Sequence, residues 1–234
     1  MSNCNLIVEN SGVPDIVLNS NIKDTTVIDI GCNQGEMAIN FLRLGAQKVV
    51  CIEPNDKLCS IIENNIINAG FSKDNFVILN YGLSDKKEDL NNITFVNCWT
   101  LGTRESTGLD ISPGAREITN ESTFNVKLIT LDELLDSGVI GGKINFIKID
   151  VDGYEFKVLR GGLKFIEQYK PEILFELSYL PKHCGDDPIE MIEFISNNLK
   201  YGFFKINGEE VSKEYVINNF PWNTSCDIIL RPIK

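Results

Sequence analysis

The sequence predicts an α/β fold built on a doubly wound, mostly parallel sheet. Three observations support this. The run 27–30 is apolar on both faces of a strand and breaks into a glycine turn, strand and helix patterns then alternate up to residue 79, and a second apolar run follows at 144–149. Strands that are apolar on both faces are typical of buried parallel sheets, and right-handed crossovers between them place helices on both faces.

Helical spacing of apolar residues follows each of the first two strands. The first stripe begins after Gly35 and ends at Gly45, and the second runs from Leu58 to Gly70; a glycine is the usual residue just past a helix end. Further strands are predicted at 49–53, 76–79, 126–129, 144–149, 173–177, 203–206 and 227–230. Further helices are predicted within 131–135, 156–166 and 189–199, with a break at Gly161 and Gly162.

The turn after the first strand is the predicted binding loop. Gly31 and Gly35 allow backbone angles that other residues avoid, or a close approach by a ligand. A dinucleotide-binding loop requires a third glycine in the middle of the motif, where this chain has Asn33. The spacing therefore disfavours a pyrophosphate and with it a nicotinamide dehydrogenase. The alternative is a tight strand-to-helix turn that binds nothing.

Two acids indicate which ligand the loop binds. Glu53 closes the second strand, roughly 20 residues after the glycines, where an acid accepts hydrogen bonds from ribose hydroxyls. Asp29 lies inside the motif, where a carboxylate suits a cationic ligand better than a phosphate. Together they favour S-adenosylmethionine (SAM). The candidate cofactor-binding residues are Asp29, Gly31, Cys32, Asn33, Gln34, Gly35, Glu53, Pro54, Gly82, Leu83 and Asp150.

A lysine and two acids close the strand at 144–149. If the chain stays extended, alternation places Lys148, Asp150 and Asp152 on one side. Mutual charge pairing is one explanation, because an unpaired buried ion is costly. The other is a site in which Asp150 and Asp152 orient the cofactor, hold a divalent cation such as Mg²⁺, or draw a proton from the acceptor; Gly153 beside them would let a ligand approach closely.

Composition bounds the remaining possibilities. With 22 basic and 33 acidic residues the formal charge is −11, which disfavours non-specific binding to nucleic acid. The chain shows no signal peptide and no apolar stretch long enough to span a bilayer, so we expect a cytoplasmic protein without membrane insertion. The seven cysteines form no C-x-x-C pair and indicate neither a disulfide framework nor a zinc site.

Length is compatible with one domain over residues 1–234, with two flanking features. Residues 1–26 are Asn-rich and are predicted to cover the sheet. Residues 84–123 are polar and interrupted by glycines, which indicates an insertion or lid over the acceptor site.

These motifs resemble the FkbM-type SAM-dependent methyltransferases. The resemblance covers about residues 25–180, and its most specific block is Lys148-Ile149-Asp150-Val151-Asp152-Gly153-Tyr154-Glu155, with Asp152 where the family more often has Glu. It implies the Rossmann-like class I methyltransferase fold, with seven strands and an antiparallel last strand. It also implies that Gly31, Asn33 and Gly35 line the methionine part of SAM, Glu53 the ribose, and Asp150 with Asp152 the floor near the transferred methyl.

The resemblance further implies an oxygen acceptor, frequently a sugar hydroxyl of a small natural product, a nucleotide-linked sugar or a surface polysaccharide. A hydroxyl must lose its proton, and His183, Asp152 and Glu176 are the candidate bases, with Lys148 as a further catalytic candidate. Methylation of RNA or protein and a non-catalytic SAM-binding subunit are the alternatives.

Overall fold

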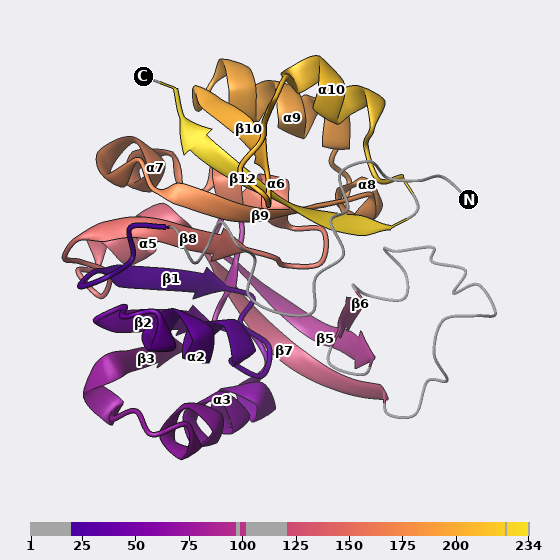
Figure 1. Ribbon diagram of the computed structural model, residues 1–234. Coiled ribbons are helices and arrows are strands. Elements are labelled where there is room, and N and C mark those ends of the chain that lie inside the picture. Colours follow the sequence, from indigo (N-terminus) through magenta and orange to yellow (C-terminus); the bar gives the residue numbers. More distant parts are fainter. Residues whose placement is uncertain (1–19, 97–98, 102–120, 223, 234) are drawn as a thin grey trace.

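The computed structural model describes residues 20–96, 99–101, 121–222 and 224–233, and its centre is an eight-stranded sheet (Figure 1). The strand order is β11-β10-β12-β9-β8-β1-β2-β3. Their bounds are β1 (Thr26–Ile30), β2 (Lys48–Ile52), β3 (Phe76–Leu79), β8 (Ile144–Ile149), β9 (Glu172–Ser178), β10 (Tyr201–Lys205), β11 (Glu210–Val211) and β12 (Ser225–Pro232). The short edge strand β11 adds one strand to the seven expected.

The strand directions confirm the predicted fold class. The five strands β3, β2, β1, β8 and β9 pair in parallel. The last strand of the chain, β12, runs antiparallel between β9 and β10. The carboxyl ends of the parallel strands therefore lie along one edge, toward the right of Figure 1, which is where such sheets bind ligands.

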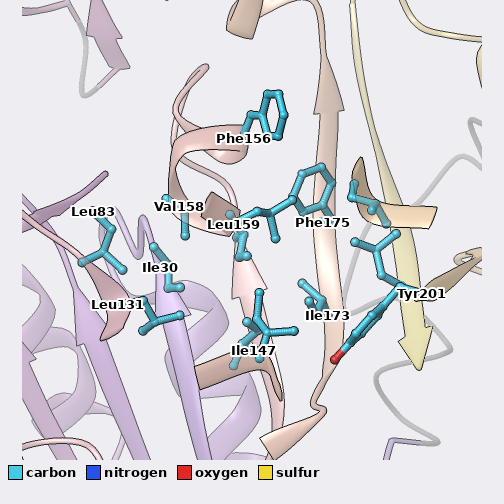
Figure 2. Packing of buried hydrophobic residues seen from close by; sticks show 14 of the residues in the cluster. Ile30, Leu83, Leu131, Ile147, Phe156, Val158, Leu159, Ile173, Phe175 and Tyr201 are labelled. Carbon is cyan, nitrogen blue, oxygen red and sulfur yellow. The ribbon is translucent and has the colours of Figure 1, made fainter. Parts of the chain in front are cut away.

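Helices cover both faces of the sheet. They are α2 (Glu36–Arg43), α3 (Asp56–Asn68), α5 (Leu131–Asp136), α6 (Glu155–Arg160), α7 (Leu163–Tyr169), α8 (Leu180–His183), α9 (Pro188–Asn197) and α10 (Lys213–Asn218), with a 3-10 turn η1 (Lys73–Asn75). Side chains of α2 and α3 pack with Val27 and Val49 on one face. On the other face α5, α6, α7, α9 and α10 bury Ile147, Phe175 and their neighbours (Figure 2).

A second sheet, in the order β4-β7-β5-β6, follows the third parallel strand. Its strands are β4 (Gly82–Leu83), β5 (Glu88–Val96), β6 (Trp99–Leu101) and β7 (Glu121–Ile129). The strand predicted at 126–129 is the end of β7 and belongs to this sheet. The predicted insertion 84–123 contributes β5, β6 and the start of β7, while residues 102–120 lie outside the described chain. Its role as a lid stays a prediction.

The predicted covering segment 1–26 lies mostly outside the described chain, which begins at residue 20. Its described end is anchored on the sheet: the Ser20 hydroxyl donates to Glu172 at 3.0 Å, and Ile22 is buried. No helix in the described part of the chain has the length and apolar character that crossing a membrane requires.

The glycine pair predicted to break a helix separates α6 from α7 and joins the two sheets. A Cβ on Gly161 would clash with the backbone carbonyl oxygen of Ser84, just after β4. The Arg160 guanidinium continues this contact with a 2.8 Å bond to Asp85. The close backbone approach at Gly161 therefore fixes where the second sheet leaves the core.

Gly161→Ala tests that approach. Gly161 has an ordinary φ of −80°, so the added methyl acts through packing alone, and we expect a loss of about 2 kcal/mol of unfolding free energy, as for an overpacked core. Gly141→Ala is the matched control, because nothing lies within 4 Å of its Cβ position. Urea denaturation of both variants measures the difference; equal stabilities would contradict the contact.

Candidate functional site

Strand alternation places four charged side chains on one face of the sheet near its carboxyl edge, namely Asp29, Lys148, Glu176 and Asp227. Their strand neighbours, such as Ile28, Ile147 and Phe175, pack in the opposite core cluster. The strand register brings the charged residues together in pairs: Asp29 lies opposite Lys148, and Glu176 lies opposite Asp227. One face of the sheet is thus apolar throughout, while the other becomes charged where the strands end.

The predicted glycine loop has the expected backbone. Gly31, Asn33 and Gly35 have φ values of 78°, 49° and 82°, all in the left-handed region. Gly31 is also required by packing, because a Cβ there would clash with the carbonyl oxygen of Asp150. Two loops at the sheet edge therefore touch backbone to backbone, a contact that the sequence did not reveal.

Glu53 braces the glycine loop from the end of β2. Its carboxylate is 4% exposed and accepts backbone hydrogen bonds from Asn33 and Asn55, each at 3.0 Å. Burial raises the pKa of Glu53 to about 7, although both hydrogen bonds act to lower it. Each oxygen keeps a further lone pair. The ribose contact predicted for Glu53 stays a prediction.

Asp29, Lys148 and Asp150 form what we call the charge bridge. The Lys148 ammonium lies 2.9 Å from Asp150 Oδ2 and 3.8 Å from Asp29 Oδ1, and it donates to the Gly31 carbonyl oxygen at 3.3 Å. Burial acts to lower the pKa of Lys148, but Asp150 and Asp29 outweigh it and the pKa is raised. Lys148 therefore stays charged beneath the glycine loop.

The segment after β8 departs from the predicted alternation. The strand ends at Ile149, and Asp152 has a φ of 51° and Gly153 a φ of 104°. Asp152 therefore does not continue the side of the strand that carries Lys148 and Asp150. The extended form ends because the backbone turns at once into α6, which begins at Glu155.

Sequence reasoning missed the role of Glu155. Its fully buried carboxylate accepts hydrogen bonds from the backbone N–H groups of Val151 and Gly153, at 3.0 and 3.1 Å. Burial raises its pKa to about 7. The available signal was an acid in the first turn of a helix directly after Asp-Gly, a position where a carboxylate commonly satisfies free backbone donors.

Gly153 is required by packing, and the ligand approach predicted there stays a prediction. A Cβ there would lie 2.9 Å from both Cys184 Sγ and Leu180 O, so α8 rests directly on this turn. His183, in α8, is half-buried with its ring 5.5 Å from that of Tyr179. The helix follows β9, so His183 lies at the carboxyl edge as predicted (Figure 1).

Glu176 is a further carboxyl with a strongly raised pKa at this edge. Its Oε2 atom is buried and has no hydrogen-bond partner within the described residues. Burial, followed by the charges of Asp150 and Glu155, raises its pKa to about 9. Such a group holds its proton at neutral pH, and strongly shifted carboxyls of this kind are common at functional sites.

The remaining candidates occupy less direct positions. Gly82 and Leu83 form β4, and the Leu83 side chain lies in the core of Figure 2. The Asn80 amide donates to the backbone oxygens of Glu53 and Pro54, each at 3.0 Å. Cys32 is buried and Gln34 is exposed. A metal at Asp150 and Asp152 has no support, since the described chain holds no group of three or more His, Cys, Asp or Glu residues arranged around an ion.

The sequence profile of the Methyltransferase FkbM domain matches residues 29–204. The chain belongs to this family. A relative is the hexuronic acid methyltransferase AglP of Haloferax volcanii, 26% identical over 194 residues, which span 80% of this chain and 69% of that protein.

Solved structures show the same fold. The methyltransferase FkbM of Methylobacillus flagellatus has a TM-score of 0.53 and 14% identity, covering 89% of this chain and 44% of that one. A putative methyltransferase of Streptococcus mutans in complex with SAH has a TM-score of 0.52 and 8% identity, and the match covers 97% of this chain and 100% of that one. An rRNA methylase of Streptococcus thermophilus has a TM-score of 0.52 and 10% identity, and the match again covers 97% of this chain and 100% of that one. The chain thus spans less than half of the solved FkbM structure.

Membership of the FkbM family implies SAM as the cofactor, and the charges of the site fit it. SAM carries a positive sulfonium, an ammonium and two ribose hydroxyls. The two cations are attracted to carboxylates, and the hydroxyls donate hydrogen bonds to them. The site offers Asp29, whose two buried oxygens have no hydrogen-bond partner among the described residues, and Glu53 at the end of β2. The phosphate groups of a dinucleotide would instead meet these negative charges.

The raised pKa values predict how stability depends on pH. Three glutamates bind a proton more tightly in the folded protein than in the unfolded chain. Their pKa values rise from the ordinary 4.5 to about 7 for Glu53, about 7 for Glu155 and about 9 for Glu176. The contribution of these groups to the unfolding free energy is fully present below pH 4.5, their ordinary pKa, and is lost as the pH rises through their raised pKa values in the folded protein. We expect the unfolding free energy to fall between about pH 5 and pH 9.

Urea denaturation at fixed ionic strength measures this trend. Glu176→Gln should flatten the upper part of the profile, whereas Glu36→Gln, at an exposed position, should leave it unchanged. A free energy that rises with pH over this range would show that these carboxyls are ionised in the folded protein.

Proposed function

We propose that the chain is a SAM-dependent O-methyltransferase whose acceptor is a sugar hydroxyl, on a nucleotide-linked sugar or a polysaccharide. The observation that carries this is the similarity to the hexuronic acid methyltransferase over 80% of the chain. Family membership supplies the reaction type. The sugar acceptor is the step that this proposal adds.

Bound SAM supplies a methyl group on a positively charged sulfur. The chain must then hold the acceptor oxygen in line with that methyl and take up its proton. Glu176 is one candidate base, because its Oε2 atom lacks a hydrogen-bond partner among the described residues; with a pKa raised to about 9, it accepts a proton only in the ionised form that grows as the pH rises. His183 and Asp152 are the other candidates at the same edge.

Lys148 takes a different role from the catalytic one predicted for it. The residue is 8% exposed, and its ammonium is held by Asp150 and the Gly31 carbonyl oxygen, so it lies under the glycine loop. The raised pKa keeps it protonated, which disqualifies it as a base. We assign it as a positioning residue.

Label transfer from methyl-labelled SAM tests the acceptor class. The panel contains nucleotide-linked sugars, neutral and uronic acid polysaccharide fragments, RNA and a protein extract, each with Mg²⁺ and with chelator. We expect label on a sugar hydroxyl. Label only on RNA or protein would reject the sugar acceptor, and SAM binding without transfer to any member would indicate a non-catalytic subunit.

Removing the base should lower turnover with SAM binding kept. We expect a loss of roughly a hundredfold in kcat for the residue that acts as base, among Glu176→Gln, His183→Ala and Asp152→Asn. Steady-state kinetics with the labelled acceptor gives kcat, and calorimetry gives the SAM affinity. Glu190→Gln, on the exposed side of α9, is the control. A variant with wild-type turnover removes that residue from the role.

A further inference from the structure

With both carboxyls ionised, the charge bridge carries one more negative than positive charge; burial raises the pKa of Asp29, and the charge of Lys148 acts to lower it. Asp29 and Asp150 supply two carboxylates, and Lys148 supplies the ammonium between them, at 3.8 and 2.9 Å. Asp29 is fully buried and Lys148 nearly so. Charges in such a position are screened far less than surface charges, so the excess acts on a ligand held nearby.

Further carboxyls surround the charge bridge, but burial raises the pKa of Glu53 and Glu155 to about 7 and that of Glu176 to about 9, so these three are partly or wholly protonated at neutral pH. The titratable groups that influence the bridge and its neighbours are carboxyls from β9 and β12, from the residue after β2, from the turn after β8 and from the start of α6, namely Glu176, Asp227, Glu53, Asp152 and Glu155. Lys148 is the cation that the described ion pairs place among them. A positively charged ligand is therefore favoured above this part of the sheet.

Asp29 is the member of the charge bridge whose carboxylate oxygens lack hydrogen-bond partners among the described residues. Both of its oxygens are buried without a hydrogen-bond partner in the described chain, and the ammonium of Lys148 lies beyond hydrogen-bond distance at 3.8 Å. A buried carboxylate left in this state is costly, and the cost is offset when a second positive charge comes close. The glycine loop lies directly beside it, since Gly31 follows Asp29 by two residues.

We propose that the charge bridge lets the site distinguish the methyl donor from its product, with Lys148 as the positioning residue that holds Asp29 and the Gly31 carbonyl in place. SAM carries a net charge of +1 at neutral pH and SAH carries none. In the transfer, the bond from the methyl carbon to sulfur breaks and its electron pair stays on sulfur. A bond from the acceptor oxygen to that carbon forms, and the hydroxyl proton leaves to the base. The site thereby loses its attraction for the sulfonium charge once the methyl group has gone, while the ammonium is the same in SAM and SAH.

This inference rests on the SAM use in the proposed function and is independent of the acceptor. Calorimetric titration of the full chain with SAM and with SAH tests it. Asp29→Asn keeps the shape of the side chain and removes its charge. We expect SAM affinity to fall on the order of tenfold while SAH affinity changes by less than about twofold. Asp136→Asn, whose carboxylate pairs with Lys164 on the surface, is the matched control.

Lys148 has its own readout. Lys148→Met leaves Asp29 buried without a counter-charge, so we expect the unfolding temperature to drop by on the order of 10 °C. Adding Asp29→Asn to that variant should recover much of the loss, and Lys148→Arg should stay near the wild type. If Lys148→Met does not fold, the double variant and the arginine variant still report the coupling.

The outcomes separate this inference from the proposed function. Equal weakening of SAM and SAH by Asp29→Asn would overturn the inference and leave methyl transfer to sugars untouched. A selective loss of SAM affinity in a chain that methylates no sugar would support the inference and reject the acceptor. A chain that binds neither SAM nor SAH would overturn both.

Discussion

The register between β1 and β8 is the constraint on which the candidate site depends. It sets Asp29 opposite Lys148 on a face that is otherwise closed by apolar packing. A lone buried ion would cost several kcal/mol, so neither residue is tolerated there without the other. The same lysine reaches the Gly31 carbonyl oxygen and Asp150, which ties together the loops that follow the two strands.

The loops at this edge are held by carboxylates acting on backbone N–H groups. Glu53 satisfies one donor in the glycine loop and one after β2, and Glu155 satisfies donors in the turn after β8. Free backbone donors at such turns otherwise require water. These carboxyls are buried to reach the donors, and burial raises the pKa of Glu53 and of Glu155 to about 7 although the hydrogen bonds act to lower it. The buried carboxyls at this edge therefore lower the unfolding free energy at alkaline pH, while they hold the loops in place and favour a cationic ligand.

The fold is shared with methyltransferases whose names differ in their acceptors. An rRNA methylase and an FkbM methyltransferase resemble this chain equally well in fold, with TM-scores of 0.52 and 0.53. The shared sheet therefore does not select the acceptor. The second sheet, which branches from the core where Gly161 meets Ser84, is a feature added to the parallel strands at that edge. We expect acceptor contacts to come from such additions.

The sequence by itself determined the fold class, the family and the glycine loop. These depend on local signals: apolar runs set the strands, Gly31 and Gly35 set the turn, and the block from Lys148 to Glu155 identifies the family. It also named the residues of the charge bridge without their arrangement.

Only the tertiary structure decided what those residues touch. Pairing across strands put Lys148 beneath Gly31, packing against α8 explained Gly153, and the end of β8 at Ile149 turned Asp152 away from the predicted side. The role of Glu155 was likewise hidden, because a hydrogen bond to a turn depends on how that turn folds. Periodicity along a chain specifies which way a side chain points, whereas its partners come from segments distant in sequence, which are fixed only when the sheet assembles.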